Sequence, residues 1–366
     1  MVSKRVFWLL AAGGLSLPSF GQDAPKIAPI PSDPLELVTG RVKAVDTPGS
    51  REAILQLLDR ARNSYALRNA GRAYDLRVSF TVDSGGQTQY DGAWQMEDLF
   101  DPRQGLHWTA TGAGYSTTQI HVEDKFYGAG TSTTIPLRLQ EARAALFDPI
   151  PSAANAVRDL IRTSTATFNG VQVTCVLLSG SGSAATAMPG RAWEESEECI
   201  DPQSGLLQVQ SQAPGRYYAY DYSNAPKLGG DVLPRKVTIT EAGRIVSKIF
   251  VDSLTELPAA DPNLFVPTAE MKASAPVIAM AEAQKIVLNS GLGAFASGGT
   301  IHPVCVFGLA TPTGQLVEAH SLQPSDPNSQ AAVEAATRMN PPNPTQPGGR
   351  PQQHFVFVIE RFVSSP

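Results

Sequence analysis

A long succession of short strand-like segments constrains the fold of this chain more than any other feature. Between Ala73 and about Phe265, segments rich in β-branched and aromatic residues are parted by Gly, Asp, Pro or Ser, which is typical of antiparallel strands joined by turns. These segments are AYDLRVSFTV, TQYDGAWQME, GLHWTATGAG, STTQIHVED, VQVTCVLLSG, GLLQVQSQ, RYYAYDY, RKVTITE and RIVSKIFVDSL. The pattern predicts one antiparallel sheet of many strands.

Helical spacing occurs in front of the strands and once among them. Residues 51–70 space their apolar side chains as an amphipathic helix does, so we expect a helix that packs against the sheet. LRLQEARAALF (137–147) and SAANAVRDLIRTS (152–164) predict a helical pair inserted into the strand series. The predicted class is α+β, with a large curved antiparallel sheet whose concave side carries helices and would enclose an apolar cavity.

The N-terminal residues have the layout of a secretory signal peptide. Lys4 and Arg5 precede an apolar run from residue 6 to residue 17, which is too short for a confident membrane span. We expect cleavage after residue 21 and a location in the periplasm or another extracytoplasmic envelope compartment; an uncleaved anchor is the alternative. Residues 22–50 are proline-rich and predict an extended tether.

Three cysteines occur, Cys175, Cys199 and Cys305. Cys175 and Cys199 lie in strand-like segments joined by the flexible SGSGSAATAMPG, as in two strands with a long hairpin loop. In an oxidising compartment this placement predicts a Cys175–Cys199 disulfide. The alternative is that all three cysteines are small buried hydrophobic residues.

The charge pattern and the motifs argue against several functional classes. The net charge is −5 and the basic residues are scattered, which disfavours nucleic-acid binding. His107 and His121 lie in neighbouring strand-like segments, but two histidines without a third ligand seldom form a metal site. No nucleophile–base motif is present. We therefore predict no catalytic residue, no cofactor, no metal and no enzymatic activity.

An acidic run, Glu194, Glu195, Glu197 and Glu198, stands out in the middle of the chain. Alternate residues of a strand share one face, so such a run predicts a solvated edge strand. Calcium binding by the carboxylates is the alternative.

Residues of about 51–272 resemble the LolA/LolB-like half-barrel proteins of the bacterial envelope. The stretches that carry this resemblance are LFDPRQGLHW (99–108), VEDKFYGAG (122–130) and GGDVLPRKVTITEAGRIVSKIFVDSLTELPAADPNLFVP (229–267). The resemblance implies the handling or sensing of a lipid or a lipoprotein. APVIAMAEAQKIVLN (275–289), within a connecting segment of residues 273–300, has a helix-like or mixed pattern.

The last 66 residues (301–366) predict a small ββαβ domain. We expect strands at 303–311 and 315–322, a helix over about 327–339, and a terminal strand. The turn Gly349-Arg350-Pro351 precedes this terminal strand, and its apolar residues alternate between two faces. Phe355, Phe357 and Ile359 point one way, and Val356, Val358 and Phe362 point the other. We expect Phe357 to share a small, separate core with Val333 of the helix.

This order resembles the C-terminal domain of TonB, over residues of about 300–366. The positions that match the family pattern are Gly314, Ala319, Ser321, Ala331, Ala332, Val333, Ala335, Gly349, Arg350, Pro351 and Phe362. The resemblance implies a protein partner, such as an outer-membrane receptor, that binds by strand addition. If the terminal strand lies at a sheet edge, Phe355, Phe357, Ile359 and Phe362 would contact that partner.

Together these features predict an exported envelope binding protein with a half-barrel domain and a TonB-like interaction domain, linked to outer-membrane transport or to lipid and lipoprotein handling. A structural or scaffold protein without a ligand is the alternative from a different class, and a hydrolase without a recognisable motif is a third.

Overall fold

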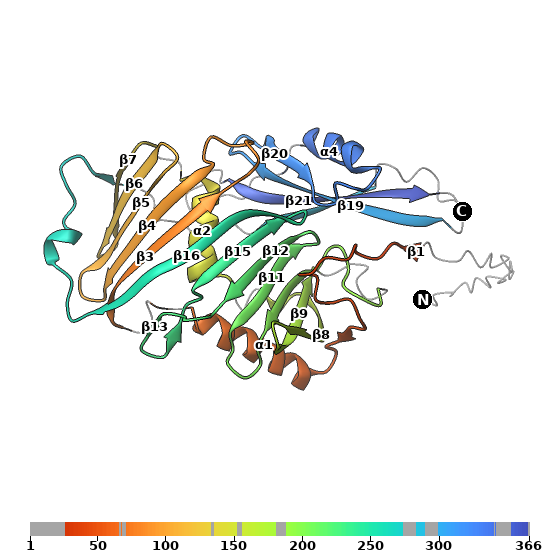
Figure 1. Ribbon diagram of the computed structural model, residues 1–366, viewed down its shortest axis with the longest axis horizontal. Coiled ribbons are helices and arrows are strands. Elements are labelled where there is room, and N and C mark those ends of the chain that lie inside the picture. Colours follow the sequence, from red (N-terminus) through yellow and green to blue (C-terminus); the bar gives the residue numbers. More distant parts are fainter. Residues whose placement is uncertain are drawn as a thin grey trace, which may run out of the picture.

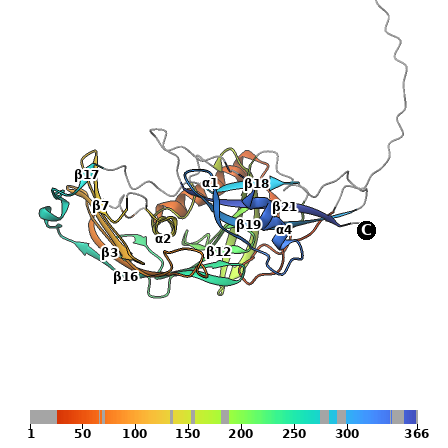
Figure 2. The ribbon, with the colours of Figure 1, turned by 90° about the horizontal axis from the view of Figure 1, so that it is seen from above.

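The computed structural model describes residues 26–65, 67, 71–132, 135–151, 156–180, 188–273, 283–289, 299–339, 341 and 353–364. Its dominant feature is a 14-stranded antiparallel sheet that curves around a concave side (Figures 1 and 2). The predicted large curved antiparallel sheet is therefore confirmed. The predicted signal peptide and the Gly349-Arg350-Pro351 turn lie outside the described residues.

The strand order in this sheet is β17-β7-β6-β5-β4-β3-β16-β15-β12-β11-β10-β9-β8-β2. The strands are β2 (Lys43–Ala44), β3 (Ala73–Val82), β4 (Gly92–Asp101), β5 (Gly105–Gly112), β6 (Tyr115–Val122), β7 (Lys125–Gly130), β8 (Leu160–Phe168), β9 (Val171–Ser179), β10 (Ser196–Ile200), β11 (Leu207–Ala213), β12 (Arg216–Asp221), β15 (Lys236–Glu241), β16 (Arg244–Leu257) and β17 (Lys272–Ala273). A short hairpin, β13 (Lys227–Leu228) with β14 (Asp231–Val232), and a 3-10 turn η3 (Pro262–Phe265) lie outside this sheet.

Two helices lie on the concave side of the sheet (Figure 2). Helix α1 (Pro48–Asn63) begins at Thr47, whose hydroxyl accepts a hydrogen bond from the Ser50 amide, with Pro48 at the first turn. Helix α2 (Leu137–Phe147) confirms the first half of the predicted helical pair. Neither of these helices, nor any other helix of the described residues, is long and apolar enough to cross a membrane.

The second helix of the predicted pair, residues 152–164, is wrong from residue 160 onward. Residues 160–168 form strand β8, which pairs with β9 along its whole length. The sequence LIRTSTATF carries a β-branched residue at every second position from Ile161 to Thr167, which suits a pleated strand better than a helix.

A second sheet of five strands covers part of the same concave side (Figure 2). Its order is β1-β19-β21-β18, with β20 also paired to β19, and helix α4 packs on its far face. The elements are β1 (Lys26–Ile27), β18 (Gln284–Leu288), β19 (Thr300–Ala310), β20 (Leu316–Ser321), α4 (Ser329–Thr337) and β21 (His354–Ser364). The predicted ββαβ order of the C-terminal region is confirmed.

Residues 284–288 are a strand of the small sheet, where their pattern led us to expect part of a helix-like or mixed connecting segment. β18 runs parallel to β21, from the pair Gln284–Val356 to the pair Leu288–Glu360. Ile286 and Leu288 pack toward the α4 side, whereas Val287 packs toward the large sheet. A short apolar run of this kind fits a strand or a helix equally well, and the pairing with β21 decides between them.

The two faces of β21 belong to different apolar clusters. Phe355, Phe357 and Ile359 pack with Leu137 and Trp193 of the large-sheet part. Val356 and Val358 face α4, where they pack with Ala332 and Ala336. The predicted alternation is therefore confirmed, but the predicted common core of Phe357 and Val333 is wrong. Phe357 instead joins the small sheet to the large one.

Candidate functional site

An open groove of about 580 Å³ lies where the N-terminal segment, the turns of the large sheet and the C-terminal sheet meet. We call it the junction groove. Its lining residues are Ala28, Pro29, Ile30, Pro31, Ser32, Asp33, Trp193, Gly215, Tyr217, Ala242, Gly243, His302, Pro303, Leu322, Gln323, Pro324, Ser325, Asp326 and Pro327. The volume lies within the ~300–1,000 Å³ typical of ligand sites, which often form between structural units.

The N-terminal segment forms one wall of the groove and is held from both sides. β1 pairs in parallel with the start of β19, and the Ala28 amide donates a 2.8 Å hydrogen bond to the carbonyl of Ile301. On the other side, the indole Nε1 of Trp193 donates to the Ala28 carbonyl at 3.0 Å. Ala28 is therefore held at one end of this wall, whose sequence predicts only an extended tether.

The opposite wall joins a turn of the large sheet to the end of β20. Gly215 lies in the β11–β12 turn at φ 88°, and a Cβ there would lie 2.8 Å from the Leu322 carbonyl oxygen. Gln323 bridges the two parts: its side-chain amide donates to the Pro214 carbonyl at 3.1 Å and accepts from the Cys305 amide at 2.7 Å. Only glycine permits this close approach, and the glutamine fixes it.

A buried ion-pair cluster lies next to the groove. Nη1 of Arg191 lies 2.9 Å from a carboxylate oxygen of Glu36 and 2.9 Å from one of Glu197. The Tyr217 hydroxyl, whose residue also lines the groove, donates to Glu36 at 2.9 Å. Burial raises the pKa of Glu197 to about 8, with Arg191 lowering it and Glu36 raising it further. Two carboxyl groups share one guanidinium, so the neutral form of one of them is favoured.

In the acidic run 194–198, Glu195, Glu197 and Glu198 are buried and Glu194 is partly buried, which corrects the expectation of a solvated edge strand or a calcium site. Glu195 forms a 2.6 Å ion pair with Arg162, and Glu194 pairs with Arg361 of β21. Glu197 pairs with Arg191, and Glu198 accepts from the Gln210 amide at 3.4 Å. β10 is an inner strand that buries Glu197 and Glu198, and the two glutamates just before it meet cations from distant parts of the chain, on β8 and β21. Arg191, three residues before the run, was the one local signal.

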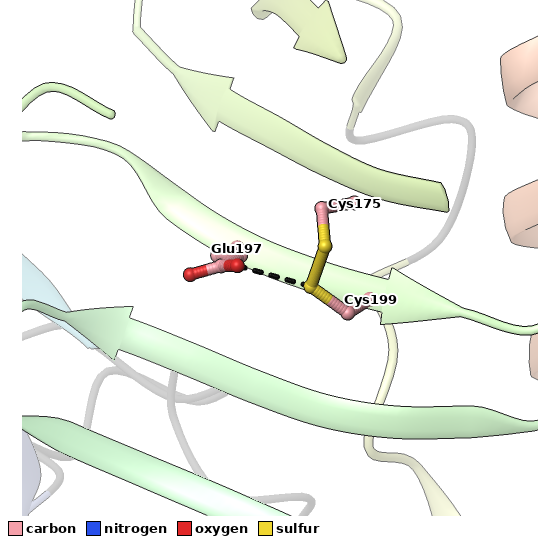
Figure 3. Close-up of side chains that lie close together, drawn as sticks. All are labelled: Cys175, Glu197 and Cys199. Atoms are coloured by element: carbon pink, nitrogen blue, oxygen red, sulfur yellow. Dashed lines mark hydrogen bonds between the residues drawn. A yellow bond between two sulfur atoms is a disulfide. The ribbon is translucent and has the colours of Figure 1, made fainter. Parts of the chain in front are cut away.

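The Cys175–Cys199 disulfide predicted from the sequence is present (Figure 3). The two residues lie directly opposite each other on β9 and β10, with their Cα atoms 3.9 Å apart. One oxygen of Glu197 lies 3.0 Å from the Cys199 sulfur. The three side chains have the proximity of a metal-ligand set, but sulfurs bonded to each other are not thiolate ligands. Cys305 is a free, buried thiol, and burial raises its pKa to about 12.

Two of the four residues predicted to bind a partner, Phe357 and Ile359, are paired on both sides of their strand. β21 pairs with β19 on one side and with β18 on the other, and Phe355, Phe357 and Ile359 have no exposed surface. Phe362 is half-buried and packs against the α4 side. The terminal strand therefore does not meet the condition for strand addition at Phe357 and Ile359; Phe355 and Phe362 lie beyond the stretch Val356–Glu360 that pairs with β18. Its two apolar faces are explained by the two clusters that it joins.

A second buried network holds α2 on the concave face. Arg138 of α2 and Arg216 of β12 both contact Glu241, at 2.8 and 2.9 Å, and Arg216 also pairs with Glu141 of α2. Arg216 lies 4.5 Å from the ring centroid of Phe307 in the small sheet, a cation–π geometry. Helix α2 is thus a fixed part of the core, to which both sheets are attached.

The curved sheet led us to expect an apolar cavity on its concave face, but the part of that face next to α2 is packed. Trp108 of the sheet and Leu139 and Leu146 of α2 belong to one cluster and have no exposed surface. His107 and His121 do not meet, because His107 pairs with Ile120 and His121 with Leu106, so their side chains point to opposite faces. His121 instead stacks on Phe126.

No known protein family matches the sequence, so the TonB resemblance gains no support, and no curated protein sequence matches it either. Solved structures with some likeness include an outer-membrane lipoprotein-sorting protein domain from Vibrio parahaemolyticus, 9% identical, covering 58% of this chain and 95% of that one at a TM-score of 0.35. A LolA superfamily protein from Nitrosomonas europaea is 10% identical, with 58% and 96% covered and a TM-score of 0.34. A DUF1329 family protein from Desulfovibrio piger is 8% identical, with 59% and 96% covered and a TM-score of 0.36. Scores this low do not establish a common fold.

Proposed function

We propose that this protein is an exported envelope protein that acts by binding, and that its ligand lies in the junction groove. The observation that carries the proposal is the groove itself, an open space of about 580 Å³ formed by segments that are far apart in the sequence. The groove offers a ligand a complementary shape, apolar contacts and hydrogen-bond acceptors. These features suit the binding of a ligand and not covalent catalysis.

The extracytoplasmic location is supported by the disulfide. Disulfides between cysteines form and persist in oxidising compartments, and Cys175 and Cys199 are bonded within the sheet. Removal of residues 1–21 on export is part of this proposal. Intact mass of the protein recovered from the envelope fraction would show the shortened chain with one disulfide, whereas retained N-terminal residues would indicate an anchor.

The rigidity of the groove also supports a binding role. Its N-terminal wall is fixed by Trp193 and Glu36, and its opposite wall is fixed by Gln323. A preformed site loses little conformational entropy when the ligand binds, so a modest contact area is enough for useful affinity.

A second candidate function is the capture of an envelope protein, such as an outer-membrane receptor, by strand addition, as the TonB resemblance implies. The observation that favours it is the position of β18, which ends the small sheet in the described part of the chain. The residues of β18 are only partly buried. An end strand has backbone groups on its outer edge that an added strand can pair with.

The test blocks the groove with a large side chain at one exposed lining position. Ser325→Trp would fill the groove from an exposed lining position, and Ala53→Trp on the exposed face of α1 is the matched control. Each variant is exported and purified, and bound molecules are identified by native mass spectrometry. We expect the ligand to be lost in Ser325→Trp and retained in Ala53→Trp. Equal ligand content in both would contradict the groove. A protein partner captured equally by both variants would favour β18.

A further inference from the structure

The junction groove has proline-rich walls that offer backbone acceptors without backbone donors. Five of its lining residues are prolines, which lack a backbone N–H: Pro29, Pro31, Pro303, Pro324 and Pro327. The side-chain N–H groups of Trp193 and Gln323 already donate to the carbonyls of Ala28 and Pro214. The Tyr217 hydroxyl donates to Glu36. Besides these, the lining side chains that can donate are the hydroxyls of Ser32 and Ser325 and the ring of His302. A ligand that fits the proline walls gains most by supplying donors of its own.

The groove is also acidic. Asp33 and Asp326 line it, and none of its described lining residues is a lysine or an arginine. Each aspartate uses Oδ1 to accept one backbone amide, from Leu35 and Asn328 respectively, at 2.8 Å. No hydrogen bond to either Oδ2 occurs among the described residues. Arg191 beside the groove does not offset this charge, because two carboxyl groups share its guanidinium.

The remaining lining residues are mostly apolar, among them Ala28, Ile30, Ala242 and Leu322. From the apolar lining, the two carboxylates and the proline walls, we infer that the groove binds a basic, partly apolar segment of a partner polypeptide. Lysine or arginine side chains would donate to Asp33 and Asp326, and apolar side chains would lie along the proline walls. This rests on the proposed function of the groove. The same charges disfavour anionic phosphate headgroups, which the two carboxylates would repel.

The experiment uses labelled peptides of alternating leucine and lysine, and matched peptides of alternating leucine and glutamate, with the protein as it is exported. We expect the leucine–lysine peptide to bind and its affinity to fall with added salt. Asp33→Asn and Asp326→Asn keep the Oδ1 acceptor and remove only the charge, so each should bind this peptide roughly three- to fivefold more weakly. Asp59→Asn, on the exposed face of α1, is the control for net charge and should bind as the parent does.

Several outcomes would overturn the inference. One is equal binding of the leucine–glutamate peptide, and another is unchanged affinity in both asparagine variants. Binding of phosphatidylglycerol vesicles that Ser325→Trp abolishes would mean that the groove takes a lipid: the inference would fall and the proposed function would stand. If Ser325→Trp binds the leucine–lysine peptide as the parent does, the groove is not the site and both fall.

Discussion

Glu36 and Arg191 form an ion pair of 2.9 Å with both side chains buried, although 155 positions separate them in the sequence. This pair attaches the N-terminal segment to the large sheet beside the junction groove. Arg191 is also the partner of Glu197, so one buried guanidinium serves two carboxyl groups from different parts of the fold. The stability of this region should therefore depend on the charges of all three groups.

Replacement of Arg191 tests the cluster directly. Arg191→Met would leave two buried carboxyl groups without their cation, and the loss of one partner of a buried pair costs about 3–5 kcal/mol of unfolding free energy. The triple variant with Glu36→Gln and Glu197→Gln should recover most of that loss, because no unpaired charge remains. Arg338→Met, whose exposed side chain pairs with Glu334, should change stability by less than ~1 kcal/mol. Urea unfolding gives the free energy of unfolding of all three variants. A triple variant that is no more stable than Arg191→Met would contradict the charge argument.

The pKa of Glu197 predicts a pH dependence of stability. Its folded-state pKa of about 8 lies above the ordinary 4.5, so the folded protein retains a proton that the unfolded chain releases. The contribution is fully present below about pH 4.5 and is lost as the pH rises toward 8. Glu197→Gln cannot titrate, so its unfolding free energy should fall less steeply over this window. Parallel curves for the parent and the variant would show that Glu197 is ionised throughout.

Phe357→Ala tests whether the two sheets unfold together. The side chain is fully buried, and truncation of such a residue costs about 3–5 kcal/mol. Because Phe357 packs in a cluster with Trp193 and Leu137, we expect amide protection to fall in the large sheet as well as in the small one. Val333→Ala, at a half-buried position of α4, should have a smaller effect confined to the small sheet. Full protection of the large sheet in Phe357→Ala, measured by hydrogen exchange, would mean that the sheets are energetically independent.

Gly215 and Gly170 allow backbone strain to be separated from contact between the sheets. Both have positive φ, 88° and 81°, so alanine should cost about 1 kcal/mol at either position through strain. Only at Gly215 would the new Cβ also meet Leu322, whereas nothing lies within 4 Å at Gly170. Gly215→Ala should therefore lower the melting temperature more than Gly170→Ala does. Equal decreases in the melting temperature of the two variants would mean that Leu322 moves aside without a loss of stability.

The pattern of residues along the chain was enough to predict the elements that depend on contacts between near neighbours in the sequence. The alternation of β-branched and aromatic residues predicted most strands of the large sheet. Helical spacing predicted α1, with Leu58 and Ala61 on its buried face. The disulfide followed from two cysteines in consecutive strands of a hairpin, where cross-strand partners are close whatever the rest of the fold does. The two faces of β21 could also be predicted, because successive side chains of any strand point to opposite faces.

Only the tertiary structure decided where those faces lie and what they meet. The glutamates at 194–198 look like a solvated strand until Arg162 and Arg361 reach them from elsewhere in the fold. The run 284–288 becomes a strand because β21 offers it an edge, and this pairing makes β21 an inner strand. The junction groove combines segments from residues 28–33 to residues 322–327. Periodicity is a property of neighbours along the chain, whereas burial, ion pairing and a binding site depend on contacts between residues far apart in it.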